Sequence, residues 1–145
     1  MWGFNPKTKD MTWARVATLL PRDIMDDGRV KPTDKIYQVP MLESLDYIMR
    51  EVPSWKCKYV PEKHDCDDFV RDFRGWLSRK DWGNLLAMDT EVLHPDKGQH
   101  NLISFMCLDR QDKYGKHPLI FGEPQTGKIV SYHESRKYTD VRLRL

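Results

Sequence analysis

A single cysteine lies among carboxylates in the segment EKHDCDDFVRDF, residues 62–73. Asp65 precedes Cys66, and Asp67 and Asp68 follow it. Acidic neighbours raise the pKa of a thiol, which leaves less of the nucleophilic thiolate at neutral pH. Three explanations are therefore open: the thiol is inert, a metal ion lies beside it, or another positive group offsets the acids.

The residues after the cysteine predict an amphipathic helix over about residues 65–80. Asp65 stands at the N-cap position, and Asp68, three residues later, completes a capping box. Cys66 is then the first helical residue, where backbone N–H groups and the helix dipole favour a thiolate. The predicted apolar face consists of Cys66, Phe69, Val70, Phe73 and Leu77.

A thiolate nucleophile also needs a base and a group that orients the base. His100 begins the β-like segment 100–109, and Glu123 ends the β-like segment 119–123. A hairpin of these two segments would pair residues whose numbers sum to about 224–228. His100 and Glu123 would then lie within a few residues of each other.

The ordered motifs DCDDF, HNL and EPQTGKI resemble the papain-like C-terminal domain of the Marasmius oreades agglutinin and its small bacterial and phage relatives. The resemblance covers about residues 55–132 and implies that Cys66 is the nucleophile, His100 the base and Glu123 the third member of a triad. It also implies a calcium or manganese ion beside the active site. Such hard cations prefer oxygen ligands, which Asp67, with Asp65, Asp68 or Glu123, would supply.

Two features depart from the family pattern. The histidine and asparagine are adjacent, as His100 and Asn101, so Asn101 is expected on the opposite face of its strand. The β-trefoil carbohydrate-binding domain of the agglutinin has no counterpart in 145 residues, so the resemblance implies no sugar-binding role.

Each candidate residue also has a simpler interpretation. A cysteine on an apolar helix face is usually a small core residue, and aspartates around it are consistent with a cap and a solvated first turn. His64 competes with His100 for the role of base. Cys57, His64, Cys66 and His100 could together hold zinc, although their spacing matches no common zinc pattern.

Length and composition indicate one domain, residues 1–145, with residues 1–54 as an N-terminal helical extension. A formal net charge of +2, from 24 basic and 22 acidic side chains, does not favour nucleic-acid binding. The sequence contains no apolar run that would span a membrane, and the N-terminus does not read as a secretion signal. These features favour a cytoplasmic protein with free thiols, found in a host cell or virion if a phage encodes it.

Helices are predicted at about residues 12–20 and 41–52, ahead of the helix that begins at the cysteine, with residues 22–34 as a loop between them. Strands follow at 85–93 (which could also be helical), 100–109, 119–123 and 128–132, with a further edge strand at the C-terminus. This order predicts an α+β fold class, a papain-like cysteine-hydrolase domain with N-terminal helices packed on an antiparallel sheet.

The predicted function is a metal-assisted thiol protease or amidase that cleaves a peptide or protein substrate. Whether the chain is an enzyme at all stays open. The alternative is a non-catalytic binding or inhibitor protein, or a structural component of a virion, that keeps the same fold.

Overall fold

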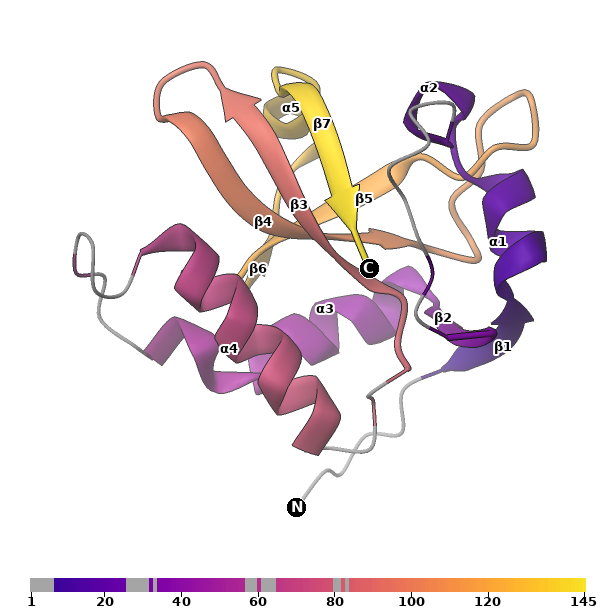
Figure 1. Cartoon of the computed structure of the whole chain (residues 1–145), viewed down its shortest axis with the longest axis horizontal. Coiled ribbons are helices and arrows are strands. Elements are labelled where there is room, and N and C mark those ends of the chain that lie inside the picture. Colours follow the sequence, from indigo (N-terminus) through magenta and orange to yellow (C-terminus); the bar gives the residue numbers. More distant parts are fainter. Residues whose placement is uncertain are drawn as a thin grey trace.

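The computed structural model describes residues 7–25, 32, 34–56, 60, 65–79, 82 and 84–145 (Figure 1). This part of the chain contains two antiparallel sheets. The smaller sheet pairs β1 (Thr8–Thr12) with β2 (Ile36–Pro40). The larger sheet has the strand order β6-β5-β4-β3-β7. Its strands are β3 (Ala87–His94), β4 (Gly98–Met106), β5 (Leu119–Glu123), β6 (Lys128–Ile129) and β7 (Thr139–Arg144).

Helices connect and cover these strands. They are α1 (Trp13–Leu19), α2 (Arg22–Met25), α3 (Leu42–Glu51), α4 (Cys66–Arg79) and α5 (Tyr132–Ser135), with a 3-10 turn, η1 (Pro53–Lys56), after α3. Local chemistry explains where α1 begins, because the side chain of Thr12 accepts a hydrogen bond from the backbone N–H of Arg15 at 3.3 Å.

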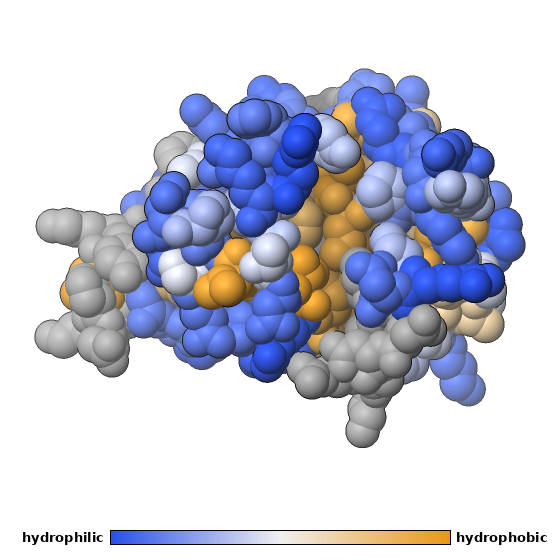
Figure 2. All heavy atoms as spheres, turned by 90° about the horizontal axis from the view of Figure 1, so that it is seen from above, coloured by the Kyte–Doolittle hydropathy of each residue, from blue (hydrophilic) through white to orange (hydrophobic). Residues whose placement is uncertain are grey.

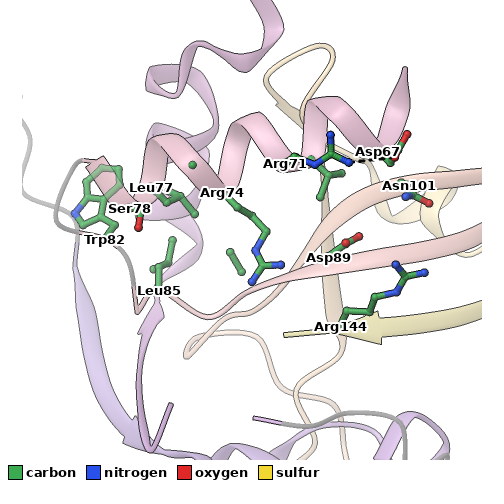
Figure 3. A pocket seen from close by; sticks show the side chains of 13 residues that line it. Asp67, Arg71, Arg74, Leu77, Ser78, Trp82, Leu85, Asp89, Asn101 and Arg144 are labelled. Carbon is green, nitrogen blue, oxygen red and sulfur yellow. Dashed lines mark ion pairs between the residues drawn. The ribbon is translucent and has the colours of Figure 1, made fainter. Parts of the chain in front are cut away.

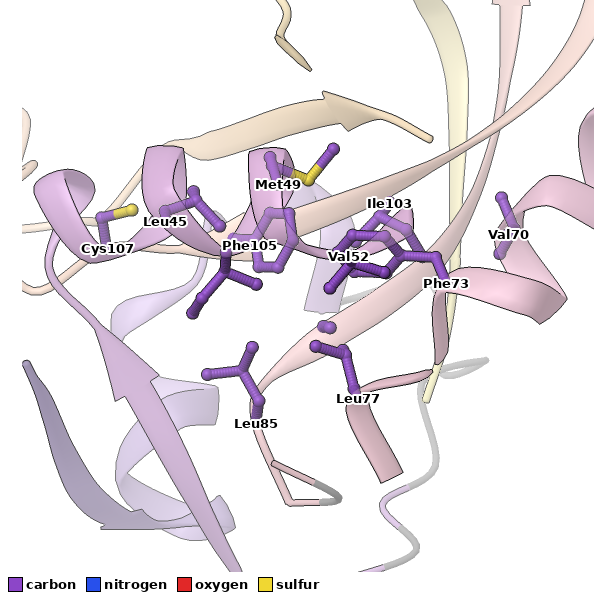
Figure 4. Packing of buried hydrophobic residues seen from close by; sticks show 12 residues of the cluster. Leu45, Met49, Val52, Val70, Phe73, Leu77, Leu85, Ile103, Phe105 and Cys107 are labelled. Carbon is purple, nitrogen blue, oxygen red and sulfur yellow. The ribbon is translucent and has the colours of Figure 1, made fainter. Parts of the chain in front are cut away.

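Helices α3 and α4 bury their apolar faces against one face of the larger sheet (Figure 4). Phe73 of α4 and Phe105 of β4 meet edge to face, with ring centroids 6.3 Å apart. Val70 and Leu77 extend this contact along α4, and Ile103 extends it along β4. The amphipathic helix predicted from the spacing of its apolar residues is thus present and buried on the expected face.

A second core lies on the other face of the sheet, where Val16 and Leu20 pack with Met88 and Met106. Between the two ends of this face, the hydroxyl groups of Thr90 and Ser104 hydrogen-bond to each other at 2.5 Å. Both residues are fully buried, and this bond gives each hydroxyl a partner inside the core.

The β4–β5 pairing fixes the place of the candidate site. Its register matches Ile103 with Gly122 and Ser104 with Phe121, within the range that the sequence predicts. Gly122 is closely packed, because a Cβ atom added there would lie 2.7 Å from the sulfur of Met49 and would force the end of that side chain to move. The pairing of β4 with β5 continues toward His100 and Glu123 at the adjacent strand ends.

The predicted fold class is wrong. The sequence predicts N-terminal helices packed on one antiparallel sheet in a papain-like α+β domain, whereas the described part has seven strands divided between two antiparallel sheets. Residues 1–54, predicted as a helical extension, contain β1 and β2. The strand TKDMT shows little alternation of apolar and polar residues because it is mostly exposed, so its pairing with β2 leaves no sequence pattern.

Two boundaries also differ from the prediction. Residues 22–34, predicted as a loop, contain the short helix α2. Residues 128–132, predicted as a strand, hold only the two residues of β6 before α5 begins, because the hydroxyl of Ser131 caps that helix by accepting the N–H of Glu134 at 3.2 Å. None of the helices described is both long and apolar enough to cross a membrane.

Candidate functional site

The N-terminus of α4 is capped as its sequence predicts. The backbone N–H of Asp65 donates to Oδ2 of Asp68 at 3.3 Å, and the N–H of Phe69 donates to the carbonyl of Asp65 at 3.1 Å. The first bond is one half of the predicted capping box, and the second is the first backbone bond of the helix. Cys66 is consequently the first residue of the helix.

The environment of Cys66 holds its thiol in the neutral form. Partial burial raises the pKa of the thiol above its usual value, and the charges of Asp65 and Asp67 raise it further. The backbone N–H of Asn101, in β4, donates to the sulfur and acts in the opposite direction. Because burial and the acids prevail, the thiolate is a minor species at neutral pH in the absence of an added cation.

His100 and Glu123 form a short, charge-assisted contact across β4 and β5. Nε2 of His100 lies 2.6 Å from Oε2 of Glu123, and both side chains are mostly buried. The other carboxylate oxygen of Glu123 accepts the backbone N–H of Gln125 at 3.2 Å, which fixes its orientation. The ring of His94 meets the ring of His100 edge to face at 6.0 Å.

Cys66 and His100 line one small cavity of about 260 Å³. Lys97, Gln99 and Gln125 complete its walls, so most of the groups around the thiol are hydrogen-bond donors. The structure therefore brings two of the predicted catalytic residues to one cavity, with Glu123 directly behind His100.

Three of the four predicted metal ligands converge at the start of α4. Asp65, Asp67 and Asp68 each offer a carboxylate oxygen within 4.8 Å of the others. A hydrogen bond with the side chain of Asp65 lowers the pKa of Asp67, so this carboxylate stays ionised. Arg71 lies 2.5 Å from Asp68 and 3.6 Å from Asp67 and supplies the positive charge in this structure. The fourth predicted ligand, Glu123, is outside this group of carboxylates and bonds His100 instead.

A larger cleft of about 530 Å³, called the arginine cleft below, runs beside these carboxylates, between α4 and strands β3, β4 and β7. Figure 3 shows Arg74 reaching into it from α4 and Arg144 from β7, on either side of Asp89. Asn101 and Arg71 lie toward the N-terminal end of α4. Burial raises the pKa of Asp89, while the nearby Arg144 and Arg74 lower it without cancelling that effect.

The opposite end of this cleft is less polar. Trp82, Leu77 and Leu85 line it, next to the hydroxyl of Ser78 (Figure 3). No sequence motif marks this cleft, because its charged residues are spread from position 67 to position 144. The only signal in the sequence is the pair Arg71 and Arg74, three residues apart on α4, and such a pair also suits a solvated helix face.

Several predictions concern residues outside the described part of the chain. Cys57 and His64 are among them, so the zinc interpretation and the role of His64 as an alternative base stay predictions. Cys107 is fully buried in the core under α3, and burial raises the pKa of its thiol to about 12, so this cysteine serves as a packing residue.

The chain matches no family model and no curated protein. It does match solved structures. One is the PSL1a–E64 complex, with a TM-score of 0.64, 20% identity and coverage of 94% of this chain and 51% of that one. Another is the Polyporus squamosus lectin bound to the human-type influenza-binding epitope Neu5Acα2-6Galβ1-4GlcNAc, with a TM-score of 0.67, 18% identity and coverage of 94% and 49%. The likeness shows a shared fold, and this chain spans about half the length of these structures.

These comparisons correct the family prediction. The chain is similar in fold to the Polyporus squamosus lectin structures, so its identification with the Marasmius oreades agglutinin domain and the papain-like fold class are wrong. The predicted cysteine hydrolase or thiol protease, and with it the peptide or protein substrate, is also wrong, because the structural neighbours are lectins. Of the predicted functions, the non-catalytic binding protein agrees better with these neighbours.

Proposed function

We propose that this chain is a non-catalytic binding domain that takes an acidic, hydroxyl-rich ligand, carbohydrate by class, in the cleft between α4 and the sheet. The observation that carries the proposal is the set of three arginines, Arg71, Arg74 and Arg144, which line one cleft from two separate elements. A guanidinium group binds a carboxylate through two parallel hydrogen bonds, so such a cleft favours an anionic group on the ligand.

The three arginines are not equivalent. Arg71 is paired with Asp67 and Asp68, and Arg144 lies 3.2 Å from Glu91. Arg74 makes no ion pair within the described part of the chain, which leaves its guanidinium able to meet a ligand. We therefore assign the main contact with an anionic group to Arg74, with Arg144 facing it across Asp89.

The remaining walls suit the rest of a sugar. The amide of Asn101 and the carboxylate of Asp89 can donate to and accept from hydroxyl groups, while Trp82 and Leu77 offer apolar surface to the C–H face of a ring. A volume of about 530 Å³ lies in the usual range for small-ligand sites. The lectin epitope of the structural neighbour contains Neu5Ac, a sugar that carries a carboxylate, which supports this ligand class.

Isothermal titration with Neu5Acα2-6Galβ1-4GlcNAc tests the proposal, with neutral Galβ1-4GlcNAc as the control ligand. We expect binding of the acidic trisaccharide and a loss of roughly tenfold or more in Arg74→Gln, in line with a charge-assisted hydrogen bond. Arg142→Gln is the matched control, because it removes the same charge from the surface without touching the cleft.

Two results would overturn the proposal. If a folded protein binds neither sugar at millimolar concentration, the sugar site of such lectins belongs to the half of the neighbour that this chain does not match. If Arg74→Gln and Arg142→Gln weaken binding equally, the cleft is not the site.

We also propose that a divalent cation, calcium or manganese, binds Asp65, Asp67 and Asp68. Their three carboxylates supply the hard oxygen donors that such ions take, and their mutual spacing allows one ion to reach them all once Arg71 turns away. The ion would replace Arg71 as the positive charge at the start of α4 and free that arginine for the cleft beside it.

Thermal melting in calcium or manganese, compared with chelator at fixed ionic strength, tests the ion. A ligand at one hundred times its Kd adds about 2.7 kcal/mol to the free energy of unfolding, which is a shift of several degrees for a domain of this size. Asp67→Asn should reduce the shift, since Asp67 is exposed and is not the cap. Asp46→Asn on α3 is the control, and an unshifted melt of folded wild-type protein would exclude the site.

The roles predicted for Cys66, His100 and Glu123 as nucleophile, base and orienting group stay a prediction. What supports a functional role is that Cys66 and His100 line one polar cavity and that Glu123 contacts His100 at 2.6 Å. The reactivity of the thiol is the property that tests them.

A further inference from the structure

A second cleft of about 590 Å³ lies at the β5–β6 edge of the larger sheet, between α2 and α5. It has no lining residue in common with the arginine cleft or with the cavity beside Cys66. Helices α2 and α5 lie on the upper side of the molecule in Figure 1. Figure 2 shows this side from above, with an apolar hollow bordered by hydrophilic side chains. The apolar part of the cleft includes Leu119, Phe121, Val130 and Val141.

The rim of this second cleft is charged and mainly positive. Arg110, from the β4–β5 loop, and Arg136, at the end of α5, line it together with a single carboxylate, that of Asp23. Arg110 donates to the backbone carbonyl of Asp109 at 3.0 Å and lies 3.8 Å from the carboxylate of the same residue, so its charge is partly offset. The exposed guanidinium of Arg136 makes no ion pair within the described residues.

We propose that this cleft binds a single aliphatic chain with one carboxylate head, that is, a free fatty acid. An apolar floor with a positive rim matches the two ends of such a molecule, and neither a fully polar ligand nor an uncharged hydrocarbon would use both. The volume lies within the range of small-ligand sites. Arg136 is the assigned partner of the carboxylate, and the tail lies along Phe121, Val130 and Val141.

Fluorescence displacement with decanoate, octanoate and decanol tests both halves of the proposal. Each buried methylene group adds about fourfold in affinity, so octanoate should bind roughly ten to fifteen times more weakly than decanoate. Decanol has the same tail without the charge, so it should bind several times more weakly than decanoate, and its affinity reports the apolar floor alone.

Two variants separate the head from the tail. Arg136→Gln should weaken decanoate roughly three- to tenfold and leave decanol unchanged. Lys137→Gln, which removes the same charge one residue away and outside the cleft, should change neither. Val141→Asp puts a carboxylate among the tail contacts and should weaken both ligands, with circular dichroism to show that the variant folds.

Three results would overturn the proposal: no decanoate binding at millimolar concentration, equal effects of Arg136→Gln and Lys137→Gln on decanoate, or binding to phosphatidylserine vesicles without binding to decanoate. The last would identify a membrane surface and not a free fatty acid as the ligand.

Discussion

The pKa of the Cys66 thiol is subject to opposing effects from its neighbours. Burial and two aspartates raise the pKa of the thiol, while the N–H of Asn101 lowers it. We expect alkylation by iodoacetamide to be slow at pH 7 and to accelerate as the pH rises past the usual thiol range, because only the thiolate reacts. Mass spectrometry of the intact protein follows the reaction, with Cys57 replaced by serine and the buried Cys107 as an unreactive internal control.

A cation at Asp65, Asp67 and Asp68 would change this rate. Positive charge beside the thiol lowers its pKa, so calcium should accelerate alkylation of Cys66 at fixed pH, and Asp67→Asn should remove the acceleration. The same assay with E64, the partner in the PSL1a complex, asks whether this thiol is accessible to that molecule. Labelling that is fast at pH 7 without any cation would contradict the raised pKa.

At the scale of the elements, α4 is held by its apolar face. Phe73 is fully buried against Phe105, so Phe73→Ala should lower the free energy of unfolding by about 3–5 kcal/mol through lost burial and the cavity it leaves. Urea unfolding measures the loss, with Ser78→Ala as an exposed control on the same helix. An unchanged midpoint of urea unfolding for Phe73→Ala would mean that this face of α4 does not contribute to the hydrophobic core.

The contact between α3 and β5 depends on Gly122, which has no side chain. A Cβ atom at position 122 would come within 2.8 Å of two atoms of Met49 and 3.2 Å of Phe105. Gly122→Ala should therefore destabilise the protein by about 1–3 kcal/mol, the usual cost of overpacking. The second substitution Met49→Ala should restore part of the loss from Gly122→Ala, and an additive double variant would show that the two sites do not touch.

The sequence predicts elements well where one face is buried. The spacing of apolar residues predicts α3 and α4, and the caps Thr12 and Asp65 place two helix starts correctly. The predicted register also places Glu123 near His100. The pairing of β1 with β2 carries no such signal because β1 is mostly exposed, and this is why the sequence predicts no strand at residues 8–12 or 36–40.

The arginine cleft could not be predicted because it depends on tertiary structure. Arg74 and Arg144 are seventy positions apart in the sequence. Only the pairing of β7 with β3 brings Arg144 into the cleft that Arg74 lines. The short motifs around Cys66, His100 and Glu123 are local and can be recognised in the sequence, yet the family that they predict is wrong. Local motifs thus located a polar cavity without specifying the protein that contains it.

At the scale of the whole molecule, one carboxylate joins three elements. Asp89 lies on β3, between Arg74 of α4 and Arg144 of β7, where burial raises the pKa of its side chain above the ordinary value. Its folded-state pKa is therefore higher than its unfolded-state pKa. The stabilising contribution of the protonated form is fully present below the unfolded pKa, about 3.9, and is lost as the pH rises through the folded pKa.

Asp89→Asn should consequently be more stable than the wild type at pH 7, where the native carboxylate is ionised and partly desolvated, and the difference should shrink toward zero below about pH 4. Urea unfolding between pH 3.5 and 8 measures this profile. Asp96→Asn, in the exposed β3–β4 turn, controls for the loss of one negative charge. If Asp89→Asn is instead less stable at pH 7, Arg74 and Arg144 outweigh the desolvation of Asp89, and the carboxylate serves to hold α4 against β7.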